Sequence, residues 1–399
     1  MINIIDGGVT AVKGFMASSV CAGLKENGTE DMAMIASRVP CIAAGCFTRN
    51  TLKGAPIVWD IERIKDASAI QAVVANAGIA NACAGEEGLI LCHEMAETVA
   101  AGLIISPESV LLASTGKIGV PLPKEKILAG TEELCRNLES SISAGTMAAR
   151  AVMTGDRTEK QVAVNFTLED GTIATVGAFA KGSAMLQPNM CTLLSFITTN
   201  LSISRELLGE ALSEDVRETY NMLCVDGDTS PNDAVILLAN GLAGNAQITE
   251  RSIDFQLFKE VLHEVNVSLV RQIAQDGKGA LLVCQAVHAP DKETARKVAR
   301  AVVSSAGIKK RFGLKELRWG QVMSVIGQTG IPFEQGQIDL MIESRSGSLH
   351  FVSRGRDTGY DRAEAEKILG DAEVRLVVDL GNGAAEATAY GCADSALQT

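Results

Sequence analysis

A nucleophile could lie in the stretch from Lys181 to Thr199, KGSAMLQPNMCTLLSFITT. Pro188 and Asn189 favour a turn, and Thr192 follows just before an apolar run. A hydroxyl residue in that place is typical of a helix N-cap. It could instead be a nucleophile if the chain is cut between Cys191 and Thr192, because an N-terminal threonine carries its own base, an α-amine with a pKa of about 8. The residue types allow both interpretations.

A second candidate lies at the end of a predicted strand in the stretch from Val110 to Pro121, VLLASTGKIGVP. Its apolar residues end in Ser114, Thr115 and Gly116. Backbone amides at such a glycine turn can converge on one point and hold an oxyanion. A plain strand-to-loop turn gives the same pattern. The spacing is compatible with an oxyanion site and with a purely structural turn.

Two further segments contain polar residues that could complete such a site. The stretch from Gln161 to Lys181 alternates polar and apolar residues around an Asp-Gly pair, which predicts a β-hairpin. We expect that hairpin to bring Lys181, Gly182 and Ser183 to the nucleophile. The stretch 148–156, AARAVMTGD, is typical of a helix end and contains Thr154.

Composition excludes several classes of protein. The chain has 399 residues, 47% of them hydrophobic, and a formal net charge of −12, which argues against a nucleic-acid surface. The sequence has no apolar stretch of the length that a membrane span needs, and its first residues do not form a secretion signal. Ten cysteines without a C-x-x-C pair indicate a cytoplasmic protein with reduced thiols, and four scattered histidines predict no metal site.

These motifs resemble those of the ornithine acetyltransferase (glutamate N-acetyltransferase) family. That family reads Lys-Gly-Ser-Gly-Met, then Pro, then Met-Ala-Thr-Met-Leu around its processing site. Here Ala184 replaces the second Gly, Cys191 replaces the Ala, and Leu193 replaces the Met that follows the Thr. The family's Ser-Thr-Gly-x-Ile-Gly is matched completely from Ser114 to Gly119. Similar segments recur from residues 8–15 to residues 387–392, so the resemblance covers nearly the whole chain.

The resemblance implies an α/β, N-terminal-nucleophile-like layered fold and an autocatalytic cleavage into subunits 1–191 and 192–399, assembled as two copies of each. It implies that Thr192 is the nucleophile and that Thr115 and Gly116 stabilise the oxyanion. It implies that Lys181 and Thr154 bind the substrate, and position 278, occupied by Lys278, is a substrate-binding position as well. The expected reaction is ping-pong transfer of an acetyl group from N-acetylornithine or a related N-acyl amino acid to glutamate or another amine, in arginine biosynthesis and without a cofactor. The expected partners are therefore small molecules.

The sequence departs from the family in the part that binds the acceptor. The family's Asp-Gly-Glu-Gly-Ala-Thr-Lys reads DGKGALL here, so that Lys278 replaces a glutamate that contacts the substrate amino acid. The family's C-terminal Asn and Ser or Thr have no counterpart before Thr399. A cation would repel an ammonium that the glutamate attracts. Two alternatives therefore stay open: an N-terminal-nucleophile amidohydrolase resembling aminopeptidases, and a non-catalytic relative.

Several elements are predicted around these motifs. Residues 263–275 and 294–304 read as helices, residues 196–203 as a strand, and residues 339–353 as a hairpin around Ser346 and Gly347. The segment 225–241, VDGDTSPNDAVILLANG, follows the family closely, with Pro231 in place of a Thr. Its polar residues predict a helix N-terminus near Asn232 and Asp233.

Overall fold

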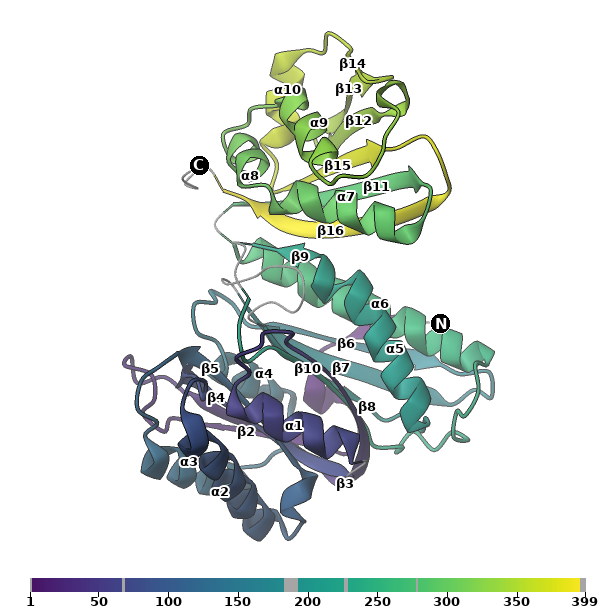
Figure 1. The fold of residues 1–399 in the computed structure, drawn as a ribbon. Coiled ribbons are helices and arrows are strands. Elements are labelled where there is room, and N and C mark those ends of the chain that lie inside the picture. The colour runs from purple at the N-terminus through teal and green to yellow at the C-terminus, as the bar shows by residue number, and fades with distance from the viewer. Residues whose placement is uncertain (1, 67–68, 183–192, 226–228, 278, 395–399) are drawn as a thin grey trace. The chain divides into compact units, whose positions relative to one another are not determined.

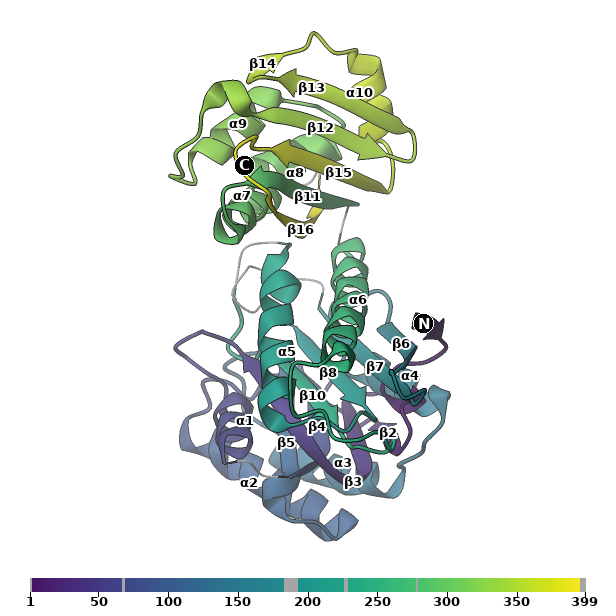
Figure 2. The same ribbon diagram turned by 90° about the vertical axis from the view of Figure 1, so that its right-hand side faces the viewer.

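The computed structural model describes residues 2–66, 69–182, 193–225, 229–277 and 279–394 (Figures 1 and 2). The chain divides into two compact units. Unit 1 takes its described residues from Met1–Gly182, Thr192–Val216 and Thr229–Leu269. Unit 2 takes its described residues from Arg217–Asp228 and Val270–Thr399.

Unit 1 is built, within the described residues, on a nine-stranded sheet in the order β1-β6-β7-β8-β10-β3-β4-β5, with β2 paired to β3. Its strands are β1 (Ile2–Ile5), β2 (Phe15–Val20), β3 (Met32–Phe47), β4 (Ile70–Ile79), β5 (Val110–Lys117), β6 (Lys160–Thr167), β7 (Ile173–Lys181), β8 (Leu194–Thr199) and β10 (Ala234–Ala239). Its helices are α1 (Ala55–Lys65), α2 (Gly85–Leu103), α3 (Lys124–Arg136) and α4 (Ile142–Ala151), together with most of α5 (Arg205–Glu218) and α6 (Ile253–Gln275).

Strand β3 belongs to two layers of unit 1. Its residues 32–36 pair with β2 and β4, whereas its residues 42–47 pair with β10. Pro40 lies between these halves and offers no backbone N–H, and the pairing with β4 shifts there, so the strand can bend. Side chains from both layers share one apolar core, which includes Ile35, Val73, Leu111, Phe179, Phe196 and Ile236.

Helices cover the outer faces of these layers. Helices α1, α2 and α3 pack on β2 to β5 through a second apolar cluster that includes Met34, Trp59, Met95 and Leu112. Helices α5 and α6 run side by side across β8 and β10 (Figures 1 and 2). The Asp215 carboxylate of α5 joins the two helices, because it lies 2.6 Å from His263 Nδ1 and accepts a hydrogen bond of 2.6 Å from Asn266 Nδ2. Unit 1 is therefore layered as helices, strands, strands and helices.

The hairpin of β6 and β7 places Lys181 beside β8. The turn residue Gly171 has a φ of +85°, and the Asp170 carboxylate accepts from Thr172 N, so the Asp-Gly pair closes the turn. Strand β7 then pairs antiparallel with β8, with Lys181 opposite Leu194. The strands before and after the expected cleavage site are thus neighbours in one sheet.

Unit 2 is a seven-stranded sheet, within the described residues, with helices packed on it. The strand order is β14-β13-β12-β15-β11-β16-β9. The strands are β9 (Leu223–Cys224), β11 (Ala280–Ala289), β12 (Asp339–Ser344), β13 (Gly347–Ser353), β14 (Arg356–Asp357), β15 (Glu373–Asp379) and β16 (Ala385–Ala393), and the helices are α7 (Lys292–Ser304), α8 (Ala306–Gly313), α9 (Trp319–Gly327) and α10 (Arg362–Leu369). Alternate strand residues such as Leu282, Cys284 and Ala286 share a core with α7 to α10.

Short 3-10 helices occur in both units among the described residues. They are η1 (Val9–Ala11), η2 (Pro107–Ser109), η3 (Tyr220–Met222) and η4 (Gln335–Gln337).

The structure confirms the α/β class, both hairpins and the helices predicted at 263–275 and 294–304, and corrects three details. Asn232 and Asp233 precede strand β10 rather than a helix, because the six apolar residues that follow pair with β8 and β3. The strand predicted at 196–203 begins at Leu194 and ends at Thr199. Strand β5 runs through Thr115 and Gly116 to Lys117 instead of ending before them, because it stays paired with β4.

Candidate functional site

Thr115 and Gly116 lie near the end of β5, at the edge of the buried part of unit 1. In the parallel pairing with β4, Thr115 stands opposite Ala77 and Gly116 opposite Gly78. Gly116 has a φ of +132°, and a Cβ added there would lie 2.3 Å from the carbonyl carbon of Gly78. No side chain fits between the two strands at this point, so a residue other than glycine would displace Thr115.

Lys181 joins two threonines that are far apart in the sequence. Its Nζ lies 3.3 Å from Thr115 Oγ1 and 2.8 Å from Thr154 Oγ1. The Lys181 side chain is 3% exposed, and Thr115 is buried, whereas Thr154 is exposed. The cluster therefore reaches the surface of unit 1 at Thr154. Because an ammonium has only donors, both hydroxyls accept from Lys181, and each keeps its own hydrogen for another acceptor.

The Asp156 carboxylate holds this cluster together. Its Oδ1 accepts from Lys160 Nζ at 2.8 Å and from the Gly182 amide at 2.7 Å, and its Oδ2 accepts from the Thr154 amide at 3.1 Å. Lys181 Nζ lies 3.9 Å from Oδ2. One buried carboxylate thus connects the residues after α4 with the start of β6 and the end of β7.

Charge and burial shift the pKa values of Lys181 and Asp156 in opposite directions. Burial lowers the pKa of the Lys181 ammonium below its ordinary value, although attraction to Asp156 works against that shift. Burial alone would raise the pKa of Asp156, but Lys181 and Lys160 hold that pKa below its ordinary value. Asp156 is therefore ionised at neutral pH, and it is the main group that keeps a proton on Lys181.

Leu193, the residue that follows Thr192, is fixed by two hydrogen bonds. Its amide donates to Asp233 Oδ1 at 3.1 Å, and its carbonyl oxygen accepts from the Ala234 amide at 3.2 Å. Asp233 is buried, its Oδ2 has no hydrogen-bond partner among the described residues, and burial raises the pKa of its carboxyl well above the ordinary value. The backbone next to the expected cleavage site is thus held by an acid that is costly to bury.

The structure brings together Thr115, Gly116, Thr154 and Lys181 from three separate stretches of the sequence. Three other predicted positions, Cys191, Thr192 and Lys278, lie outside the described residues. Sequence reasoning gave no role to Asp156 and misplaced Asp233. The only sequence signal for Asp156 was its place two residues after Thr154, and nothing in the pattern of residues 225–241 distinguished an acid beside a strand from a helix cap.

Among the described residues, no group of three or more His, Cys, Asp or Glu side chains is arranged to hold a metal ion. None of the described helices is both long and apolar enough to pass through a membrane.

Comparison with known proteins identifies relatives along nearly the whole chain. The ArgJ family model matches residues 16–396. The arginine biosynthesis bifunctional protein ArgJ of Thermotoga neapolitana is 42% identical over 383 residues, which are 95% of each chain. Its namesake from Symbiobacterium thermophilum is 43% identical over 390 residues, covering 97% of this chain and 95% of the relative. A solved structure of Mycobacterium tuberculosis ornithine acetyltransferase complexed with ornithine is 36% identical, with a TM-score of 0.44, and covers 48% of this chain and 100% of its own.

Proposed function

The chain belongs to the ArgJ family, and we propose that it transfers an acetyl group through an acyl-enzyme on Thr192. It is an acyltransferase of the glutamate N-acetyltransferase and ornithine acetyltransferase type. The donor is N-acetylornithine or a related N-acyl amino acid, and the acceptor is glutamate or another amine. The relatives are named arginine biosynthesis bifunctional proteins, and this supports a place for the reaction in arginine biosynthesis.

The nucleophile is released by self-cleavage. The hydroxyl of Thr192 attacks the carbonyl carbon of Cys191, the peptide bond between the two breaks, and the resulting ester is hydrolysed by water. This leaves a free carboxylate on Cys191 and a free α-amine on Thr192. The amine then serves as the base for the same hydroxyl.

Transfer proceeds in two halves. Thr192 Oγ attacks the acyl carbonyl carbon of the donor while the α-amine takes its proton, and the tetrahedral oxyanion forms. The C–N bond then breaks, the proton goes to the leaving amine, and an acetyl ester of Thr192 remains. A second amine attacks that ester, loses its proton to the α-amine, and leaves as the N-acetyl product while Thr192 is restored.

The observation that carries this proposal is the placement of Lys181 between the Thr115 and Thr154 hydroxyls. Lys181 stands opposite Leu194, two residues after Thr192, so the sheet register supports a nucleophile beside this cluster. The Lys181 ammonium occupies a lone pair of Thr115 Oγ1, and this leaves the Thr115 hydrogen to donate to the oxyanion. Together with Gly116 it forms the oxyanion site. The exposed Thr154 faces the entering substrate.

Assembly and location complete the proposal. Residues 1–191 and 192–399 form two subunits that stay together after cleavage, since β7 pairs with β8 along six residues of each strand. Two copies of each subunit form the assembly, and the enzyme works in the cytoplasm on small molecules. Lys278 is a substrate-binding residue that disfavours an ammonium where the family carries a glutamate.

The test is to trap the acetyl-enzyme and follow where the acetyl group goes. Purified protein is mixed with an N-acetyl amino acid, and the fragment that begins at Thr192 is weighed after rapid acid quenching. We expect this fragment to gain one acetyl group and to lose it faster when an amine acceptor is added. Acetyl loss at a rate that no amine changes would show a hydrolase, and a fragment that never gains an acetyl group would refute the Thr192 mechanism.

A further inference from the structure

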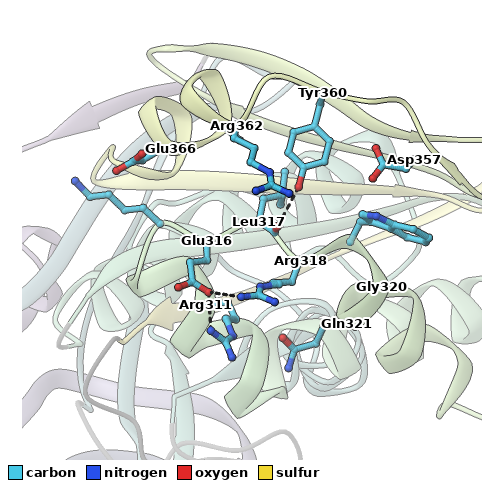
Figure 3. Close-up of a pocket in the computed structure, with 13 residues that line it drawn as sticks. Arg311, Glu316, Leu317, Arg318, Gly320, Gln321, Asp357, Tyr360, Arg362 and Glu366 are labelled. Atoms are coloured by element: carbon cyan, nitrogen blue, oxygen red, sulfur yellow. Dashed lines mark hydrogen bonds and ion pairs between the residues drawn. The ribbon is translucent and has the colours of Figure 1, made fainter.

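A pocket in unit 2, separate from the residues discussed above, has the charge distribution of an anion site. Its volume is about 780 Å³, within the usual range for small-molecule sites of roughly 300–1,000 Å³. It lies where the end of α8 meets the starts of α9 and α10 (Figure 3). Its charged lining residues are four cations and three acids: Arg311, Lys315, Arg318 and Arg362, and Glu316, Asp357 and Glu366.

The cations on this wall are only partly neutralised. Glu316 pairs with two of them, with Arg311 Nη1 at 2.5 Å and Arg318 Nη2 at 3.4 Å (Figure 3). Lys315 and Arg362 form no ion pair with any residue that the structure describes. Two cations of this pocket thus lack an ion-pair partner among the described residues, and the charged side chains of the lining sum to one net positive charge.

Lys315 is also held in a backbone conformation that disfavours its side chain. Its φ is +59°, in the left-handed region, directly after the end of α8. Its amide donates to Phe312 O at 2.9 Å, and the Glu316 amide donates to Arg311 O at 2.8 Å. This is the helix ending at which glycine is preferred, since a side chain strains the backbone. The lysine at this place is consistent with a binding role, because residues in strained conformations are enriched at binding sites.

The rest of the lining suits an anion with an organic part. Tyr360 donates to Leu317 O at 3.0 Å and packs at the border of the unit 2 core together with Trp319. Burial raises the pKa of Tyr360, and so does the charge of Asp357, while the charges of Arg362 and Arg318 act against that shift. Helix α9 starts at the same wall with no side-chain cap on its first turn, and its end adds a weak positive potential.

We propose that this pocket binds a small organic anion with two or more negative charges, held by Lys315 and Arg362 and bordered by Tyr360 and Trp319. Arg362 contributes a planar fork that fits a carboxylate or a phosphate, and Lys315 contributes a point charge that fits either group. The shared requirement is two negative charges close together. The proposal does not depend on the reaction at Thr192.

The test is calorimetric titration of the full, purified protein with pyrophosphate and, separately, with citrate at equal ionic strength. Acetate is the monovalent control. We expect one of the two multivalent anions to bind in a saturable manner at one site per chain, and acetate to give no saturable heat. Binding of pyrophosphate alone assigns phosphate groups to the ligand, and binding of citrate alone assigns carboxylates.

Two variants locate the site. Arg362→Gln should weaken binding roughly ten- to a hundredfold, because it removes a charged hydrogen-bonding partner. Lys315→Gly should weaken binding similarly, yet it should not lower the melting temperature, because glycine relieves the left-handed backbone. Lys297→Gln, which removes an exposed charge from α7 outside the pocket, is the matched control and should bind like the parent. The proposal is overturned if neither anion binds the parent, or if both pocket variants bind as tightly as the control.

Discussion

The substitution Asp156→Asn tests how the site of unit 1 is held together. The Asp156 side chain has no exposed surface. Its carboxylate forms ion pairs with Lys160 and Lys181 and accepts hydrogen bonds from two backbone amides. Removing one partner of a buried ion pair lowers the free energy of unfolding by about 3–5 kcal/mol. We expect a loss at the lower end of that range, since asparagine keeps one acceptor oxygen. At about 2–4 °C per kcal/mol for a body of this size, the melting temperature should fall by roughly 6–12 °C.

The same variant should change the pH dependence of stability in a defined direction. The pKa of Asp156 is lower in the folded than in the unfolded protein, so its stabilising contribution is present above the unfolded pKa, about 3.9, and is lost as the pH falls through the folded pKa. The difference in melting temperature between parent and variant should therefore have its largest value at pH 7. It should narrow as the pH drops below about 4.

Activity gives an independent measure of the same contact. Without Asp156 the ammonium of Lys181 loses its main attraction, and its lowered pKa falls further. The alkaline limb of the kcat/KM profile should therefore move to lower pH. Glu159→Gln is the matched control, because it removes a partly exposed carboxylate that pairs with Arg150 at 2.7 Å and should change stability by less than about 1 kcal/mol. A variant Asp156→Asn with the parent's melting temperature and pH profile would refute the reasoning.

Three further substitutions follow from the site. Thr115→Ala should slow acyl transfer roughly a hundred- to a thousandfold in steady-state kinetics, the usual effect of losing one oxyanion donor, while its melting curve should match that of the parent. A near-normal rate would mean that other groups stabilise the oxyanion. Lys278→Glu should increase kcat/KM for N-acetylornithine with glutamate, because it restores the family's carboxylate, and an unchanged or lower value would contradict the role of Lys278. Asp233→Asn should raise the melting temperature at neutral pH, because the raised pKa of the buried acid makes its ionised form costly; the gain should vanish near pH 4, and a loss at neutral pH would show a stabilising carboxylate.

The parts of the fold that follow local rules were predictable. The Asp170-Gly171 turn and the alternation around it predicted the hairpin that ends at Lys181, and the structure confirms both strands. Family motifs predicted a set of site residues, and the described ones, Thr115, Gly116, Thr154 and Lys181, do lie together, while their roles stay predictions. The resemblance placed these residues at one site, whereas composition and spacing could not.

The features that could not be predicted depend on contacts between residues that are far apart in the sequence. The apolar residues after Asp233 carry no periodicity that separates a short buried strand from a helix, and only their partners β8 and β3 settle the choice. Asp156 is an ordinary acid in the sequence. Its importance arises from Lys160 and Lys181, which approach it through the antiparallel pairing of β6 with β7. Lys315 is likewise unremarkable until its φ is known.

The mass of the purified protein tests the central claim most directly. If Thr192 becomes an N-terminal nucleophile, intact-mass analysis under denaturing, reducing conditions should show two fragments, 1–191 and 192–399, and sequencing of the second should begin at Thr192. Under native conditions the two should elute as one species, because β7 and β8 are paired in one sheet. The variant Thr192→Ala should stay uncut. A parent chain that remains at the full mass of 399 residues after prolonged incubation would contradict the account.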